Sequence, residues 1–282
     1  MTVTGLLLAA NYILVATGFN LTFGIMKIVN FAHGVLYMLG AYTAFIAVMT
    51  LGLNYFLAVI AAIFFTWLLG WASERWLLRG EIRKDILAAI IVTLGLVNVF
   101  MASALLIFGE RPKGFRSPFA GVAHVGNVVI PLEKLLPAAI ALLLVVALHL
   151  FLKFTKTGQS LRAVSEDSEA AALMGIKVDR AYSMGFSLGA AMAGAAGALI
   201  APIFVIEVGM GALPLWKTFV VVILGGMGSL SGCVLAGLLL GLIDSFVGTL
   251  VSPIMASILG FSAIILILMV RPQGFMGEKI EI

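Results

Sequence analysis

Long uncharged runs divide the chain into segments of the length that a membrane-spanning helix needs. A helix requires about 20 apolar residues to cross the hydrocarbon core of a bilayer. Residues 28–73 carry no charge and are long enough for two such helices, broken near Gly52–Asn54. The other uncharged runs are 3–26, 86–109, 135–152, 181–206, 218–243 and 245–270. The pattern therefore predicts eight spans.

Composition supports the bilayer as the main solvent. The 282 residues are 62% hydrophobic and only 11% charged, and the mean hydropathy is +1.19. A soluble domain carries about 25% charged residues. Helices and closed barrels are the only structures that satisfy their backbone hydrogen bonds in lipid, and barrel strands would alternate apolar and polar positions. The continuous apolar runs predict an all-α polytopic bundle, with residues 1–282 forming one transmembrane domain.

The net charge of +4 fits the positive-inside bias of membrane proteins better than binding to nucleic acid. With the N-terminus outside, five basic residues face outward: Arg111, Lys113, Arg116, Lys134 and Lys217. Ten face inward: Lys27, Arg75, Arg79, Arg83, Lys84, Lys153, Lys156, Arg162, Lys177 and Arg180. The excess predicts this orientation, with loop 153–180 in the cytoplasm.

The C-terminus does not fit simple alternation, which would put Arg271 and Lys279 outside. An additional crossing within 205–232 would put them inside. That stretch contains Pro214 and the glycine-rich run 225–232, and both residue types interrupt helices. Broken or re-entrant helices are tolerated in membranes where they line a cavity. Nine or ten spans therefore stay open beside eight.

Catalytic and nucleotide-binding motifs are missing from the sequence. No G-x-x-x-x-G-K-[ST] phosphate loop occurs, and no His, Cys, Asp or Glu residues cluster at metal-ligand spacing. The chain is therefore not expected to be an enzyme or to hold a metal or its own ATP. An ion-coupled secondary transporter remains an alternative, although no acidic cluster lies within the spans.

The inner loop contains a short helix pattern. Ser165 is a good N-cap, Glu166, Asp167 and Glu169 suit a first turn, and Gly175 is a natural stop. These signals predict a helix of about nine residues. Its apolar face combines Ala170, Leu173 and Met174 at i, i+3, i+4 spacing. Burying Leu173 or Met174 would stabilise by roughly 1.5–3 kcal/mol each, so this face is expected to pack against the membrane domain or a partner.

Within that loop, Glu169-Ala170-Ala171 followed after three residues by Gly175 resembles the EAA-x3-G motif of ABC-importer permeases. The I-x-L-P that completes the motif in some members is absent. The resemblance implies that this helix docks on a cytoplasmic ATPase and couples it to transport. The residues assigned to coupling are Arg162, Glu166, Asp167, Glu169, Ala170, Ala171, Leu173, Met174 and Gly175. An ordinary amphipathic connector is the alternative.

Further motifs resemble the branched-chain amino acid permeases of the LivH type. They are Asn20–Gly34 with Gly40-Ala41-Tyr42, Arg162-Ala163-Val164, Leu224–Ser229 and Arg271-Pro272-Gln273-Gly274. The resemblance implies an importer of the bacterial inner membrane with a second homologous permease, two ATPase subunits that bind ATP, and a periplasmic solute-binding protein. The substrate does not follow, because the family also includes permeases for urea, short amides and other amino acids.

Polar residues inside apolar runs are candidates for the solute pathway. Asn30 and His33 are three residues apart and can share a helix face; alternatively, Asn30 caps the second helix and His33 bonds a backbone carbonyl. Thr93 and Asn98 are further candidates, or they bond across helix interfaces.

Two further groups of residues carry weaker signals. Glu207 and Lys217 flank a Gly/Pro segment at the outer end, where they could contact the docking protein or form a surface pair. Asp244, near a run boundary, is expected to be snorkelled or paired. Small-xxx-small spacing predicts close helix packing at Gly185/Gly189, Gly228/Gly232 and Gly237/Gly241. Gly225-Gly226 is expected to be a hinge or a half-helix end.

Overall fold

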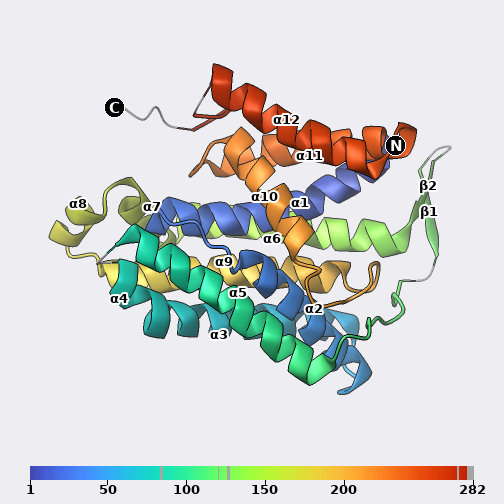
Figure 1. Cartoon of the computed structure of the whole chain (residues 1–282), viewed down its shortest axis with the longest axis horizontal. Coiled ribbons are helices and arrows are strands. Elements are labelled where there is room, and N and C mark those ends of the chain that lie inside the picture. The colour runs from blue at the N-terminus through green and yellow to red at the C-terminus, as the bar shows by residue number, and fades with distance from the viewer. Residues whose placement is uncertain (83–84, 120, 126–127, 272, 278–282) are drawn as a thin grey trace.

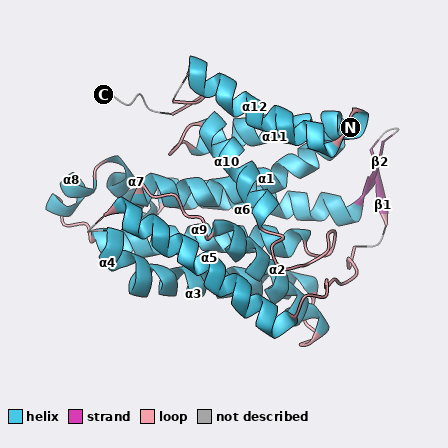
Figure 2. Cartoon of the chain, viewed as in Figure 1, coloured by secondary structure: helices cyan, strands magenta, loops and turns pink. Residues whose placement is uncertain are grey.

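The computed structural model describes residues 1–82, 85–119, 121–125, 128–271 and 273–277. The described chain is a bundle of helices with one small hairpin, as Figures 1 and 2 show. Arg83, Lys84, Pro272 and Lys279, used above for orientation and resemblance, lie outside the described residues. The elements are α1 (Thr2–Met26), α2 (His33–Met49), α3 (Tyr55–Ser73), a π-helical turn (Glu74–Leu78), α4 (Arg79–Ile82), α5 (Ile86–Phe108), β1 (Val122–Val125), β2 (Val128–Pro131), α6 (Leu132–Phe154), α7 (Lys156–Glu166), α8 (Ser168–Leu173), α9 (Val178–Ile200), α10 (Ala212–Gly225), α11 (Leu230–Leu250) and α12 (Pro253–Val270).

Seven of the described helices are long and apolar enough to cross a membrane, with α3 continuing through the π-helical turn to Ile82. Two more, α2 and α10, are apolar but shorter, at 17 and 14 residues. The predicted break near Gly52–Asn54 is confirmed, because α3 begins after Asn54, whose side chain accepts a hydrogen bond from the Leu57 amide at 2.9 Å.

The predicted span over 218–243 is wrong. The chain breaks at Gly226–Ser229 between α10 and α11, and α11 continues to Leu250. Charged residues served as run boundaries in the sequence, but Lys217 and Asp244 both lie inside helices. The predicted all-α class holds apart from the antiparallel pair β1–β2, which sits in the loop between α5 and α6.

Helix α1 runs through the centre of the bundle, between α9 and α11 (Figure 1). Glycines allow this close approach on both sides. A Cβ added at Gly189 of α9 would lie 2.2 Å from Thr22 Oγ1, and one added at Gly241 of α11 would lie 2.6 Å from the Ala9 Cβ. Gly185 and Gly237 meet α1 in the same way. These contacts confirm close packing for the Gly185/Gly189 and Gly237/Gly241 pairs, and they stay within the chain.

Helix α9 also packs tightly on α2. A Cβ added at Gly197 would lie 1.9 Å from the Tyr37 carbonyl oxygen, and one at Gly40 would lie 2.2 Å from the Gly194 carbonyl oxygen. Away from this core, α5 and α12 expose large apolar side chains such as Leu106, Ile107 and Met269. Apolar surface of this extent suits a lipid-facing periphery.

The two ends of the bundle are distinct (Figure 1). The N-terminus lies at the end that carries β1 and β2, whereas α12 finishes at the end that carries α7 and α8. The segment after α12 turns back onto the end of α10: the Phe275 and Met276 amides donate to the carbonyls of Leu224 and Gly225 at 2.8 and 3.0 Å. The last carbonyls of α10 are thereby satisfied by a distant part of the chain.

Candidate functional site

The helix α8 projects from the end of the bundle (Figure 1). Its N-cap is Asp167, whose carboxylate accepts hydrogen bonds from the amides of Glu169 and Ala170 at 2.8 and 3.0 Å. The prediction of Ser165 as the cap is wrong, because Ser165 lies in the last turn of α7 and its hydroxyl donates to the Arg162 carbonyl. Glu166 likewise ends α7, so α8 has six residues rather than nine.

The predicted apolar face of α8 is uncovered in this chain. Leu173 and Met174 are 89% and 83% exposed, whereas Ala171 is the residue that packs inward. Gly175 then adopts φ +85°, a left-handed conformation that a side chain would strain, and this ends the helix. Leu173 and Met174 are neighbours on this projecting helix, so both side chains are available for contact with a partner.

Helix α7 holds α8 in place. Its N-cap Thr155 accepts a hydrogen bond from the Gly158 amide at 2.9 Å, and Leu161 and Val164 are buried against the bundle. A Cβ at Gly158 would lie 2.3 Å from the Phe151 carbonyl oxygen, so α7 folds tightly back on α6. The loop 153–180 is therefore held against the bundle through α7 and is not a free connector. The exposed Arg162 of α7 lines a cavity that α7 shares with α1 and α6.

A cavity of about 1040 Å³ opens between α1, α6, α7 and the start of α11. Its polar lining includes Thr17, Asn20 and Ser231, and much of the rest is Leu, Ile and Val. The Asn20 side chain accepts a hydrogen bond from the Gly228 amide at 2.8 Å, while its Nδ2 has no partner among the described residues. Asn20 thus ties the centre of α1 to the break between α10 and α11.

That break is a half-helix end. Gly226 is the C-cap of α10 at φ +100°, and Ser229 caps α11 by accepting from the Gly232 amide at 3.1 Å. Gly225 packs directly on Gly232, because a Cβ there would lie 2.5 Å from the Gly232 carbonyl carbon. Gly228 lines the cavity instead of packing.

The four residues predicted to line the pathway do not line this cavity. The Asn30 side chain accepts from the Ala32 amide at 3.0 Å, and His33 Nε2 lies 3.0 Å from the Val15 carbonyl oxygen. Thr93 joins this turn by accepting from the Phe31 amide at 3.3 Å. Asn98 is exposed and donates to the Leu94 carbonyl of its own helix. The structure therefore brings Asn30, His33 and Thr93 together and leaves Asn98 apart.

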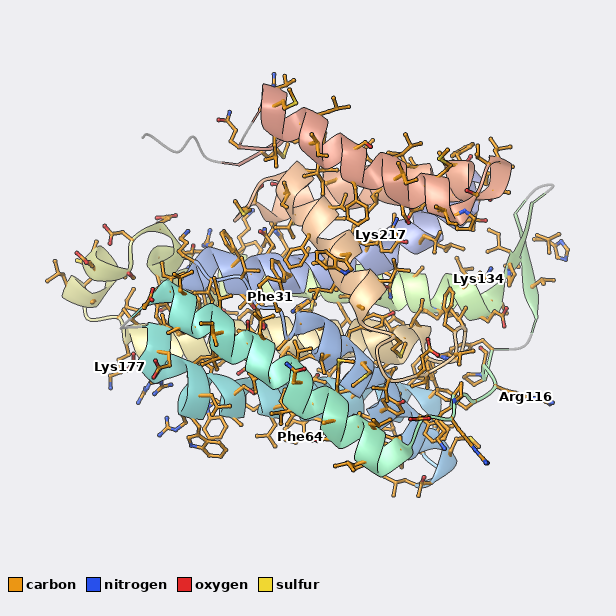
Figure 3. The ribbon with its side chains drawn as sticks, viewed as in Figure 1. Phe31, Phe64, Arg116, Lys134, Lys177 and Lys217 are labelled. Carbon is orange, nitrogen blue, oxygen red and sulfur yellow. The ribbon has the colours of Figure 1, made fainter. Side chains whose placement is uncertain are left out.

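Lys217 is not at the surface, which corrects its assignment to a docking pair with Glu207. Its ammonium lies 2.8 Å from Asp244 Oδ1, and their side chains are only 5% and 10% exposed. The Tyr12 hydroxyl donates to the other carboxylate oxygen of Asp244 at 2.7 Å. Three residues from α1, α10 and α11 thus form a polar cluster inside the bundle, with Lys217 labelled in Figure 3. The pairing expected of Asp244 is confirmed, whereas Glu207 is exposed.

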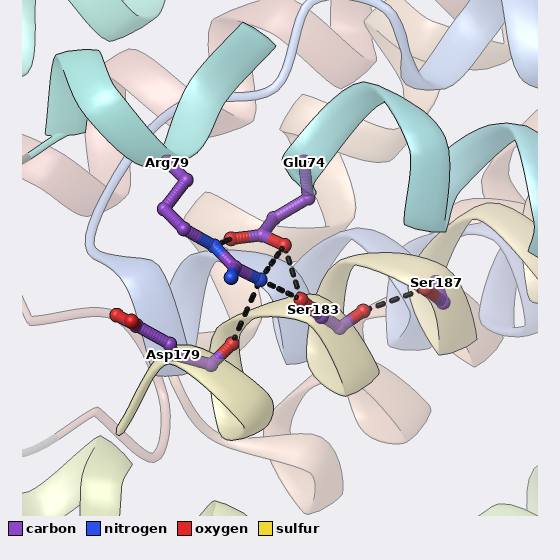
Figure 4. Close-up of polar contacts among 5 residues, drawn as sticks. All are labelled: Glu74, Arg79, Asp179, Ser183 and Ser187. Atoms are coloured by element: carbon purple, nitrogen blue, oxygen red, sulfur yellow. Dashed lines mark hydrogen bonds and ion pairs between the residues drawn. The ribbon is translucent and has the colours of Figure 1, made fainter. Parts of the chain in front are cut away.

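A second buried cluster joins α3 to α9 (Figure 4). Glu74 is fully buried and accepts two hydrogen bonds from Arg79, at 3.2 and 3.0 Å. Arg79 Nη2 also donates to Ser183 Oγ at 2.6 Å, and the Ser183 hydroxyl donates to Glu74. Ser187 donates to the Ser183 carbonyl one turn further along α9. The end of α3 is therefore fixed to the start of α9, directly after α8.

Comparison with known proteins shows the family of the chain. The family described as the permease component of branched-chain amino acid transport systems matches residues 1–270. The high-affinity branched-chain amino acid transport system permease protein LivH of Escherichia coli K12 is 31% identical over 288 residues, which is 97% of this chain and 94% of that protein. The chain belongs to the branched-chain amino acid permease family.

Other members of the branched-chain amino acid permease family match over similar lengths. The permease protein BraD of Pseudomonas aeruginosa PAO1 is 31% identical and covers 98% of this chain and 94% of its own. A probable LivH of Methanocaldococcus jannaschii is 27% identical over 94% of this chain and 88% of its own. No solved structure matches the chain significantly. With seven long apolar helices, this branched-chain amino acid permease is a multi-pass protein of the bacterial inner membrane.

In both buried clusters of this branched-chain amino acid permease, the sequence did not predict which residues are partners, although it predicted that Asp244 is snorkelled or paired. Glu74 and Arg79 are five apart, a spacing that does not share a face in an α-helix. The π-helical turn brings them together, and the Arg79 amide bonds the Glu74 carbonyl across it. For Lys217 and Asp244, the only signal was a charge of each sign next to long apolar runs, which calls for a partner in the membrane.

Proposed function

We propose that this chain is the membrane-spanning permease subunit of an ATP-driven importer of branched-chain amino acids, and that separate ATPase subunits drive it through α8. The observation that carries the proposal is the exposure of Leu173 and Met174, at 89% and 83%. Both lie on or at the end of α8, which α7 holds away from the bundle, and the chain is a member of this permease family. A cytoplasmic partner would bury both side chains. Their burial would stabilise the complex by roughly 1.5–3 kcal/mol for each side chain.

The coupling route continues into the bundle. The loop from α8 enters α9 after Gly175, and the Glu74–Arg79–Ser183 cluster fixes the start of α9 to α3. Movement of α8 would therefore carry α9 and α3 together, and α9 packs on α1 and α2 through glycines. ATP binding can shift the permease between two states only through its different affinity for them.

The proposed topology has nine crossings, counting α2 and α10 with the seven long helices. The N-terminus is then outside, and α7, α8 and the C-terminus lie inside. The position of both α8 and the end of α12 at one end of the bundle supports this (Figure 1). Arg271 would then add to the inner positive charge. Uncharged runs in the sequence predict only eight crossings, because the break at Gly226–Ser229 lies inside one of these runs.

The proposed assembly also holds a second homologous permease and a periplasmic solute-binding protein. Lys113 and Ile206 pair as an isolated bridge that links the α5–β1 loop to the α9–α10 loop. The exposed Glu207 lies beside this bridge and is a candidate contact for the binding protein. For the solute, the cavity at Asn20 offers polar and charged groups together with aliphatic side chains.

The test is transport by the reconstituted assembly in sealed vesicles. Uptake of leucine is expected to require ATP on the side of α8 and a loaded binding protein on the other side, and to survive collapse of ion gradients by ionophores. Uptake by this chain alone, driven by an ion gradient and independent of ATP, would instead establish an ion-coupled secondary transporter and overturn the proposal.

A further inference from the structure

A second cavity of about 710 Å³ lies between the end of α3 and the start of α9. Its lining holds four basic residues, Arg75, Arg79, Lys177 and Arg180, and the acidic Asp179. Trp67 and Trp71 line the same cavity. The cavity shares no lining residue with the one at Asn20, and the proposed coupling route uses Arg79 but leaves Arg75, Lys177 and Arg180 without a role.

The lining of this cavity, taken together with the Glu74 carboxylate beside it, carries a net positive charge. Glu74 is bonded to Arg79, and Asp179 is the acidic group of the lining. Four basic residues less these two acids leave an excess of two positive charges. Arg75 lies over the ring of Trp71 at 5.6 Å, so its partner is an aromatic face rather than a carboxylate.

The start of α9 adds to the positive field. Helix N-termini carry partial positive charge and unsatisfied amides, which favour anions and disfavour cations. Here the N-cap is Lys177, which makes no side-chain cap, and the first turn holds both Asp179, which favours the dipole, and Arg180, which opposes it. The cationic side chains at this position are repelled by the helix dipole. An anion bound in the cavity would offset this repulsion. Lys177 lies near the α8 end of the bundle in Figure 3.

The depth of the cavity matches the lipid headgroups. A helix that rises 1.5 Å per residue crosses a hydrocarbon core of about 30 Å in about 20 residues, which from Tyr55 reaches Glu74. Arg75 and Arg79 therefore stand at the headgroup level. Trp71 and Trp76, whose rings lie 5.8 Å apart, sit where aromatic belts form. Above them, α3 exposes Phe64, Phe65 and Leu68 along the path of an acyl chain.

We propose that this cavity binds the phosphate headgroup of an anionic phospholipid of the inner leaflet, with the acyl chains along α3. The phosphate would lie among Arg75, Lys177 and Arg180, next to the Glu74–Arg79–Ser183 cluster. Such a lipid stabilises the junction of α3 and α9 that follows α8. Free phosphate offers the same chemistry, so the experiment separates the two sources.

Tryptophan fluorescence of the full chain provides the measurement. The chain has four tryptophans, of which Trp67, Trp71 and Trp76 are on or beside this cavity and Trp216 is on α10. In a Trp216→Phe background, brominated phosphatidylglycerol is expected to quench more than brominated phosphatidylcholine at the same minor mole fraction. Equal quenching by the two lipids overturns the proposal.

Matched variants locate the effect. Arg75→Gln/Arg180→Gln should weaken the phosphatidylglycerol preference about 25-fold, since a basic residue near a membrane surface contributes about fivefold to binding an anionic lipid. Arg75→Lys/Arg180→Lys should keep it. Lys153→Gln/Lys156→Gln removes two exposed charges at the same end of the bundle and should also keep it. Equal loss in the control means general attraction to a basic surface and overturns the proposal.

Two further arms separate other occupants. If inorganic phosphate at constant ionic strength abolishes the preference, the cavity binds free anions and the lipid proposal fails. Native mass spectrometry of the assembled transporter should retain bound phosphatidylglycerol, and retain less with Arg75→Gln/Arg180→Gln. Complete displacement of the lipid when the ATPase binds means that the cavity is a protein contact, which also overturns the proposal.

Discussion

Lys217 and Asp244 form a 2.8 Å ion pair between α10 and α11, with both side chains almost inaccessible. The pair joins the half-helix α10 to the helix that follows its break, and the Tyr12 hydroxyl ties the same carboxylate to α1. Burying either charge alone would cost free energy, so each residue requires the other as its partner inside the bundle.

Lys217→Met is expected to destabilise the chain by about 3–5 kcal/mol, because it leaves the Asp244 carboxylate buried without its cation. Thermal unfolding in detergent would measure the loss. The double variant Lys217→Met/Asp244→Leu removes both charges and should recover most of the stability. A single variant as stable as the parent would show that the pair contributes no more than an exposed one.

Leu173→Asp is expected to leave the chain folded in the membrane while abolishing ATP-dependent uptake, because it puts a charge on the face that the ATPase would cover. Uptake and co-purification with the ATPase are the measurements. Leu51→Asp makes the same change at another exposed leucine, between α2 and α3, and should have little effect on ATPase binding. Full uptake by the Leu173 variant would remove α8 from the coupling route.

Gly197→Ala is expected to be destabilising by about 1–3 kcal/mol, the range for overpacking a well-packed core. The new Cβ would lie 1.9 Å from the Tyr37 carbonyl oxygen, so α2 and α9 must separate. Gly95→Ala on α5 is the matched control, since a Cβ there meets nothing within 4 Å. Comparable unfolding temperatures for the two variants would contradict the packing.

Arg79→Met is expected to weaken the junction of α3 and α9 by about 1–3 kcal/mol, because the buried Glu74 loses a charged partner. The estimate is lower than for Lys217, since the Arg79 side chain is 24% exposed. Arg79→Lys keeps the charge and loses the two-pronged contact, so it should fall between the parent and Arg79→Met. A double-mutant cycle with Ser183→Ala tests the coupling, and strict additivity would argue against a shared cluster.

Cysteine labelling tests the nine-crossing topology. Cys233 is the only cysteine and is buried, so a Cys233→Ala background accepts new labelling sites. Leu173→Cys and Arg271→Cys should react from the cytoplasmic side, and Leu51→Cys from the outer side. Labelling of Arg271→Cys from the outer side would restore an even number of crossings.

Local signals in the sequence predicted those parts of the fold that depend on neighbouring residues. The break near Gly52–Asn54 was predicted because the uncharged run 28–73 is long enough for two spans, and Gly175 ended α8 because it lacks a side chain. The cap of α8 was assigned two residues too early, because Ser165 and Asp167 are both good caps and only the packing of α7 on α6 selects Asp167.

The sequence by itself determined that the chain is a helical membrane protein, which family it belongs to, and which short segment resembles the EAA-x3-G motif. Each of these depends on long apolar runs or on residues close together in the chain. Tertiary structure alone decided that Lys217 meets Asp244, that a π-helical turn aligns Glu74 with Arg79, and that Leu173 stays uncovered. These three features depend on which helices lie side by side. A charge within an apolar run indicates that a partner is needed, but it does not indicate which residue is the partner.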